Sequence, residues 1–248
     1  MIIAGTAGWS LPKAAQGAFP PEGSHLTRYS SVLRGVEINS SFYRSHSPQM
    51  YAKWAAATPR TFRFAVKVPK SITHEARLRR ARRPLEQFLA EVAGLGRKLG
   101  PLLVQLPPSF EYELRVARSF LILLRELHDG AVVCEPRHSS WFTARAEALL
   151  VEHRVARVAA DPTSIDGAAV PGGWTGLAYY RLHGSPDKYW SVYPEERVEG
   201  WARAVRQLPR STDTWCVFDN TAGGGAIVNA LQMDRATRPP RTPAARLS

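Results

Sequence analysis

Eight short apolar segments alternate with longer segments of helical periodicity, and this alternation constrains the fold more than any other feature of the chain. The apolar segments are rich in β-branched and aromatic residues and are bounded by turn residues, as is typical of strands. Segments between them, such as RPLEQFLAEVAGLGRKLG, repeat apolar residues at helical spacing, and several end in Gly. The eight predicted strands are residues 2–6, 35–40, 62–69, 102–107, 131–137, 156–161, 177–184 and 215–220.

Strands that alternate with helices imply parallel β-α-β units, and eight such units in 248 residues match a single TIM (β/α)8-type barrel in size and number. A doubly wound nucleotide-binding sheet usually has fewer strands and a Gly-rich first turn. No G-x-G-x-x-G or P-loop sequence follows any predicted strand. We therefore expect one α/β barrel domain over residues 1–237, followed by an irregular, disordered tail rich in Pro and Arg over residues 238–248.

The composition agrees with a folded domain, because 44% of the residues are hydrophobic and only 22% are charged. The first residues lack the features of a signal peptide, and no apolar stretch is long enough to span a bilayer. We therefore expect a cytoplasmic protein with no membrane partner. Cys134 and Cys216 each lie inside a predicted strand without ligand spacing, which predicts two buried reduced thiols.

The net charge of +12, from 33 Lys and Arg against 21 Asp and Glu, favours an anionic partner. That partner is either an anionic small molecule or a nucleic acid. The Arg-rich segment 77–83 follows the third predicted strand directly. It is either a solvated start of a helix or a rim that contacts phosphates, and the sequence alone leaves both interpretations open.

Side-chain alternation assigns the strand residues to two faces, because in a parallel barrel one face packs on helices and the other points inward. On the second strand, Val36 and Ile38 are expected to face helices, which directs Glu37 and Asn39 inward. The polar residues therefore gather at the C-terminal ends of the strands, where barrel enzymes place their sites. The same rule directs inward Lys67, Gln105, Glu135, Arg137, Arg181 and His183, while Asp161, Asp219 and Asn220 fall at strand ends.

This set of side chains suits an anionic ligand, because Arg137 and Arg181 offer guanidinium forks and Lys67 adds a third cation. Fixed cations oppose a divalent metal, and no H-x-H or H-E-x-x-H spacing occurs, so a metal is the weaker alternative and no other cofactor is indicated. Paired charges that merely fill the barrel are the structural alternative. The candidate acids and bases are Glu37, Glu135, His138 and His183.

Aromatic residues follow several strand ends and could stack on bases or sugars, although such residues also pack loops together. They are Trp9, Tyr43, Trp141, Tyr189 and Trp190. The candidate substrate-binding residues are Lys67, Arg137, Arg181, Asn39, Tyr43, Gln105, Trp141 and Asn220.

Seven motifs in order, GTAGWS, VEINSSFYR, WAAATPRTFRFAVKVPKSITH, LLVQLPPSF, CEPRHSSWF, YYRLHG and FDNTAGGGAIVNALQ, resemble the YecE-like family, domain of unknown function 72. The resemblance implies a TIM barrel and no established activity. The chain departs from the family pattern at Pro136, where the family typically has an aromatic residue, and at Asp219, where it typically has Asn.

Three hypotheses about function follow. The leading one is an enzyme, a hydrolase, that acts on a phosphorylated or nucleic-acid substrate at the C-terminal ends of the strands. This reading draws in part on an analogy of fold with apurinic endonucleases of the endonuclease IV type. The second is a non-catalytic binding protein for an anionic metabolite or nucleic acid. The third is a carbohydrate-active enzyme that uses Glu37 and Glu135 as a carboxylate pair. The sequence does not specify an oligomeric state.

Overall fold

The computed structural model describes residues 1–238, and strands occur at all eight predicted places. The predicted strand at 156–161 is two strands, because the ladder changes partner at Val158. A further short strand, β8, was not expected, since Gly172 and Gly173 carry no strand signal. The strands are β1 (Ile2–Thr6), β2 (Gly35–Ile38), β3 (Arg63–Lys67), β4 (Leu99–Gln105), β5 (Val132–Glu135), β6 (Val155–Arg157), β7 (Ala159–Asp161), β8 (Gly172–Gly173), β9 (Leu177–Leu182) and β10 (Asp213–Phe218).

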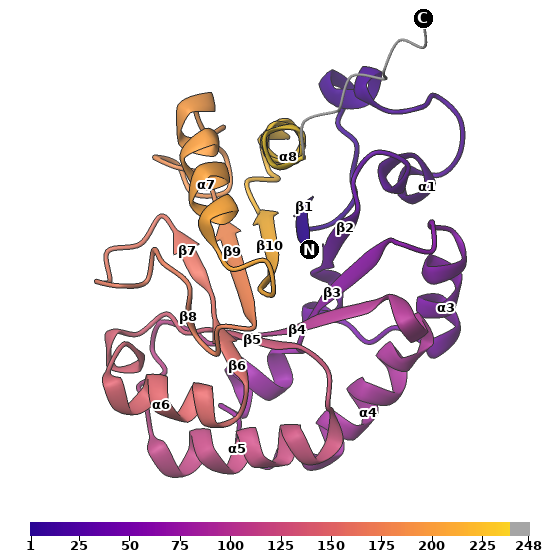
Figure 1. Cartoon of the computed structure of the whole chain (residues 1–248). Helices are drawn as coiled ribbons and strands as arrows, with labels where there is room; N and C mark the ends of the chain where they lie inside the picture. Colours follow the sequence, from indigo (N-terminus) through magenta and orange to yellow (C-terminus); the bar gives the residue numbers. More distant parts are fainter. Residues whose placement is uncertain (239–248) are drawn as a thin grey trace, which may run out of the picture.

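Helices connect most of the strands and follow one another around the outside of the strands in chain order (Figure 1). Several begin at side chains that accept a hydrogen bond from the first turn, such as Ser47 before Pro48 and Thr143 before Ala144. The α-helices are α1 (His25–Ser30), α2 (Ser40–Tyr43), α3 (Pro48–Ala56), α4 (Arg82–Val92), α5 (Leu114–Leu127), α6 (Ala144–Glu152), α7 (Glu195–Gln207) and α8 (Gly225–Thr237). Short turns of other helix types are η1 (Lys13–Ala18), η2 (Ser71–Glu75), η3 (Ala93–Lys98) and η4 (Ser139–Trp141).

The strands form two sheets rather than the single closed ladder expected of a barrel. One sheet has the order β1-β10-β9-β7 and the other the order β2-β3-β4-β5-β6-β8. All pairs are parallel except β6 with β8. The edges of the two sheets meet at β1 and β2, where an isolated bridge joins Ala7 to Glu37, and at Val158, which lies between β6 and β7. The chain is therefore an α/β fold with parallel strands enclosed by helices.

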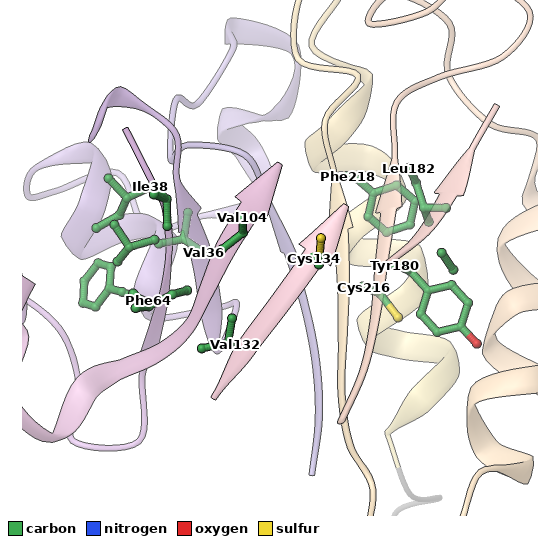
Figure 2. Packing of buried hydrophobic residues seen from close by; sticks show 14 of the residues in the cluster. Val36, Ile38, Phe64, Val104, Val132, Cys134, Tyr180, Leu182, Cys216 and Phe218 are labelled. Carbon is green, nitrogen blue, oxygen red and sulfur yellow. The ribbon is translucent and has the colours of Figure 1, made fainter. Parts of the chain in front are cut away.

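Alternation along the strands separates two apolar clusters, as the sequence predicts. The outer cluster faces the helices and includes Val36, Ile38 and both cysteines, Cys134 and Cys216, which are free thiols (Figure 2). The inner cluster includes Leu103, Val133, Trp215 and others between the strands. Because a buried aliphatic or aromatic side chain contributes about 1.5–3 kcal/mol, these two layers account for most of the burial that stabilises the fold.

Close backbone contact at the meeting edge of the two sheets requires glycine. A Cβ atom on Gly5 would lie 2.2 Å from the carbonyl oxygen of Gly35, so β1 and β2 approach too closely for a side chain.

Within residues 1–238, no helix is long and apolar enough to cross a membrane.

Candidate functional site

The C-terminal ends of the strands, which we call the mouth, hold a buried ionic network centred on Arg181 of β9. Its Nε and Nη2 donate to the two oxygens of Glu37 at 3.0 and 2.8 Å. Its Nη1 donates to Oε2 of Glu135 at 2.7 Å, and its Nη2 also donates to Oδ2 of Asp219 at 3.0 Å. Arg181, Glu37 and Glu135 are all completely buried. We call this set, together with His183, the Arg181 network.

Glu135 is the acceptor on which most of the network converges. It ends β5, where it is the register partner of Gln105 on β4, and Gln105 donates to its Oε2 at 2.8 Å. Arg137 donates to Oε1 through Nε and Nη2, at 3.2 and 2.8 Å. Burial alone would raise the pKa of Glu135, but Arg181 and Arg137 hold that pKa well below its ordinary value. The carboxyl group is therefore a fixed anion.

His183 lies between two carboxylates of the network. Its Nδ1 is 3.0 Å from Oδ2 of Asp219, and its Nε2 is 3.1 Å from Oε1 of Glu135. Nε2 is also 3.1 Å from Nη2 of Arg137. Asp219 thus orients the imidazole. Burial alone would raise the pKa of Asp219, but Arg181 and His183 lower it.

Lys67, the last residue of β3, is a second buried cation at the mouth, with an exposed fraction of 7%. Its Nζ lies 3.9 Å from the centre of the Phe42 ring, a cation–π contact. The hydroxyl of Ser41 donates to the backbone oxygen of Lys67 at 2.7 Å, which fixes α2 over the end of β3. Within residues 1–238, the ammonium group of Lys67 has neither a hydrogen bond nor an ion-pair partner.

The environment of Lys67 favours loss of its proton. Burial and the nearby charge of Arg181 lower its pKa to about 8, although Glu37, Glu135 and Asp219 partly offset them. His74 of η2 packs edge-on against the Phe42 ring, with ring centres 4.9 Å apart. Its pKa is also lowered, by burial and by the charges of Lys67 and Arg137.

A cavity of about 210 Å³ opens beside the network. Arg137, His183 and Lys188 line its polar side, and residues such as Pro136 and Val158 line its apolar side. The ring of Tyr189 packs edge-on against His183, with ring centres 5.7 Å apart. Burial and the charge of Arg137 lower the pKa of Lys188. The cavity therefore combines two cations with an oriented imidazole.

Several predicted site residues lie elsewhere. Trp141, a predicted substrate-binding residue, is buried: its exposed fraction is 2%, and its Nε1 donates to the Phe110 oxygen at 2.9 Å. The indole is buried because it packs edge-on against Phe110 and Tyr112, in the segment after β4. His138 caps η4, since its Nδ1 accepts from the Ser140 amide at 3.3 Å. Tyr43 is 72% exposed and packs edge-on against Phe42, outside the network.

Two asparagines and one aspartate also take no part in the network. Because Asp219 faces inward, the next residue, Asn220, faces the other way, and its Nδ2 donates to the backbone oxygen of Ser191, before α7, and to Oδ1 of Asn229 on α8. Asp161 likewise faces α7 and accepts from Tyr193 at 2.8 Å and from Arg197. Asn39 takes no part in the network, and its Oδ1 is buried without a partner in the described part of the chain.

Three residues of the mouth, Tyr179, Lys188 and Asp219, are not among the site residues predicted from the sequence. Tyr179 donates to Oε2 of Glu37 at 2.9 Å. It lies two positions before Arg181, so the alternation that placed Arg181 inward would also have found it. Asp219 was noted only as a carboxylate at a strand end, and Lys188 lies in a loop without any sequence signal. The described residues contain no group of three or more His, Cys, Asp and Glu side chains arranged to hold a metal ion.

The motifs at the strand ends belong to one family of proteins. The sequence pattern of the family described as "Protein of unknown function DUF72" matches residues 3–246. The chain belongs to the DUF72 family. UPF0759 protein YunF of Bacillus subtilis (strain 168) is 25% identical over 269 residues, with 94% of this chain and 93% of YunF covered. UPF0759 protein YecE of Escherichia coli (strain K12) is 31% identical over 148 residues, with 59% of this chain and 52% of YecE covered.

Solved structures of DUF72 proteins share the fold. A DUF72 protein from Enterococcus faecalis V583 superimposes with a TM-score of 0.81 at 24% identity, covering 96% of this chain and 95% of that one. One from Thermotoga maritima MSB8 has a TM-score of 0.77 at 26% identity, covering 95% and 98%. A more distant structure, SacUVDE, has a TM-score of 0.51 at 11% identity, with 82% and 79% covered, and this likeness concerns the fold alone.

Proposed function

We propose that this DUF72 protein is an enzyme, a hydrolase, that binds a phosphate ester at the mouth through Lys67, Arg137 and Lys188. The observation that carries the proposal is the ammonium of Lys67, which ends a largely buried side chain and which no side chain within residues 1–238 pairs. A buried charge is costly unless it is paired, so an anionic ligand is the natural partner for this group.

The charge balance of the mouth supports the same proposal. Three carboxylates, Glu37, Glu135 and Asp219, are all held by Arg181. Arg137 shares Glu135, whereas Lys67 and Lys188 have no carboxylate within ion-pair distance in the described chain. The cations therefore exceed the anions, and a phosphate group would restore the balance.

The residues at the mouth would divide the chemistry between them. His183, oriented by Asp219, is the proposed group for proton transfer between water and the leaving oxygen of the ester. Lys67 and Arg137 would stabilise the charge that develops on the phosphate oxygens. Arg181 and Glu37 are positioning residues in this proposal, because their polar atoms are occupied by each other.

The pKa of Glu135 disfavours the carbohydrate-active alternative. A glycosidase pair needs one carboxyl with a raised pKa to act as general acid. Glu135 has a lowered pKa, and both Glu135 and Glu37 bind the same guanidinium.

Calorimetric titration with inorganic phosphate and with sulfate tests the anion site. Lys67→Met and Arg137→Met should each weaken binding by about 10- to 100-fold, since a charge-assisted hydrogen bond contributes about 1.5–3 kcal/mol. Matched controls are Lys53→Met and Arg34→Met, which remove the same charges from exposed positions away from the mouth. Equal affinities in the four variants would contradict the proposal.

Turnover separates an enzyme from a binding protein. Nitrophenyl phosphate monoesters and diesters, mononucleotides and oligonucleotides form the substrate panel, which also separates small phosphorylated substrates from nucleic acids. His183→Gln should abolish hydrolysis while phosphate binding persists. If wild type and His183→Gln hydrolyse nothing above the level of buffer but bind phosphate, the protein is the non-catalytic binder.

A further inference from the structure

A basic groove lies between the beginnings of α4 and α5, and no part of the proposed catalytic site uses it. Its volume is about 930 Å³. Apolar side chains including Leu78, Val116 and Phe120 line its floor. Its arginines are Arg79, Arg80, Arg82, Arg83 and Arg115, against a single acidic residue, Glu113.

Two of these arginines are paired within residues 1–238. Arg79 donates to Oε2 of Glu113 at 2.6 Å. Arg82 forms two hydrogen bonds with the carboxylate of Glu126, at 3.0 and 2.7 Å. The other three, Arg80, Arg83 and Arg115, are exposed and form no ion pair within residues 1–238. The groove therefore presents three free guanidinium groups.

The backbone that carries these arginines is held in an unusual conformation. Arg77, Leu78 and Arg80 have φ angles of 48°, 64° and 51°, the left-handed region that non-glycine residues rarely adopt. Leu78 is buried, and its amide donates to the Ile72 oxygen at 2.8 Å, so it anchors the segment to the core. An anchored segment loses less conformational entropy when a ligand binds.

One segment connects the groove with the mouth. η2 ends at Glu75, just before these arginines, and its His74 packs against the Phe42 ring that covers Lys67. Arg77 donates to the oxygen and hydroxyl of Ser109 at 3.2 and 3.0 Å, which ties the segment to the loop after β4. The free arginines thus lie on the same side of the fold as the strand ends.

We propose that this groove binds the phosphodiester backbone of a nucleic acid. Three guanidinium groups unpaired within residues 1–238, from Arg83 of α4, Arg115 of α5 and Arg80 in the turn before α4, suit a ligand with repeated phosphates better than one with a single phosphate. α4, whose N-cap Ala81 provides no side-chain cap, and α5 direct their N-termini to this region, and helix N-termini favour phosphate. This inference goes beyond the proposed function, because binding in the groove requires no chemistry at the mouth.

Fluorescence anisotropy with labelled single-stranded and duplex DNA of about 24 nucleotides tests the groove over a series of salt concentrations. The variant Arg80→Gln/Arg83→Gln/Arg115→Gln should bind at least about tenfold more weakly than wild type. In this variant the magnitude of the negative slope of log K against log salt should decrease by about 3 on duplex DNA and by about 2 on single-stranded DNA. The control Arg34→Gln/Arg60→Gln/Arg210→Gln removes the same charge from exposed residues just before β2, β3 and β10, at the opposite ends of the strands.

The control should keep the affinity and the salt dependence of wild type, and both variants should keep its melting temperature. This result would support DNA binding in the groove. Equal losses in the two variants, or no DNA binding by wild type, would overturn it. Competition by polyglutamate as strong as by DNA, with the same dependence on the three arginines, would also overturn it in favour of an acidic polypeptide. Phosphate binding at the mouth is the internal reference: the groove variant should keep it, and Lys67→Met should lose it while keeping most DNA binding.

Discussion

Arg181 and Lys67 are two buried cations at the same ends of the strands, yet their surroundings are opposite. Arg181 donates to three carboxylates and is completely buried. The Lys67 side chain is nearly as buried, but its ammonium lies over an aromatic ring at 3.9 Å and has no ion-pair partner within residues 1–238. The pKa of Arg181 is therefore raised despite burial, whereas burial lowers that of Lys67 to about 8.

This difference suggests different roles for the two cations: Arg181 stabilises the fold, and we propose that Lys67 binds a ligand. A paired buried charge is a fixed part of the fold, and removing one partner leaves the others uncompensated. An unpaired buried charge costs stability in the free protein, which a bound anion would recover. The two residues should therefore respond in opposite directions when each is replaced by an apolar side chain of similar length.

The largest effect is expected for Arg181→Met. This change leaves Glu37, Glu135 and Asp219 without their shared cation, so the free energy of unfolding should fall by about 3–5 kcal/mol. Urea unfolding at pH 7 followed by circular dichroism measures it. Arg137→Met is the matched control, because Glu135 keeps Arg181 and Gln105, and it should cost clearly less. If Arg181→Met does not fold, Arg181→Lys, which keeps the charge, should fold. Equal stability of wild type and Arg181→Met would contradict the structural role of Arg181.

A smaller effect of opposite sign is expected for Lys67→Met. Burial lowers the pKa of Lys67 from 10.5 to about 8, so the unfolded chain binds more protons here between those two pH values. The free energy of unfolding of wild type should therefore rise with pH across that window, and the full penalty is present below pH 8. At pH 7 Lys67→Met should be more stable than wild type by about 1–3 kcal/mol, and this gain should shrink as the pH rises from 8 towards 10.5.

Urea unfolding from pH 6 to pH 10 with Lys53→Met as the exposed control measures this dependence. A loss of stability in Lys67→Met at pH 7 would show that the ammonium is paired after all.

The smallest effect concerns His74. The charge of Lys67 is one of the causes that lower its pKa, so Lys67→Met should raise the pKa of His74 towards the ordinary value. NMR titration of the imidazole carbon-bound protons measures it, with the pKa of exposed His25 as reference. An unchanged pKa of His74 would contradict the close approach of the Lys67 charge to the Phe42 ring and His74.

Much of this arrangement was predictable from alternation alone. The period of two along a strand, together with apolar residues that must face helices, correctly directed Glu37, Lys67, Glu135 and Arg181 inward. The eight strand positions followed from the same pattern. Alternation gives no direction after a strand ends, because a loop has no fixed period, and only the structure shows that Trp141 is buried and that His138 caps η4.

The sequence by itself determined the α/β class, the positions of the strands and which polar side chains share the interior, since these depend on local periodicity and burial. Only the tertiary structure decided which of those charges are paired. Arg181 meets three carboxylates because β2, β5, β9 and β10 bring them within hydrogen-bond distance from positions far apart in the chain. Lys67 lies on the neighbouring strand β3 and forms no ion pair in the described part of the chain, because ion pairing depends on distances of a few ångströms that no periodicity encodes.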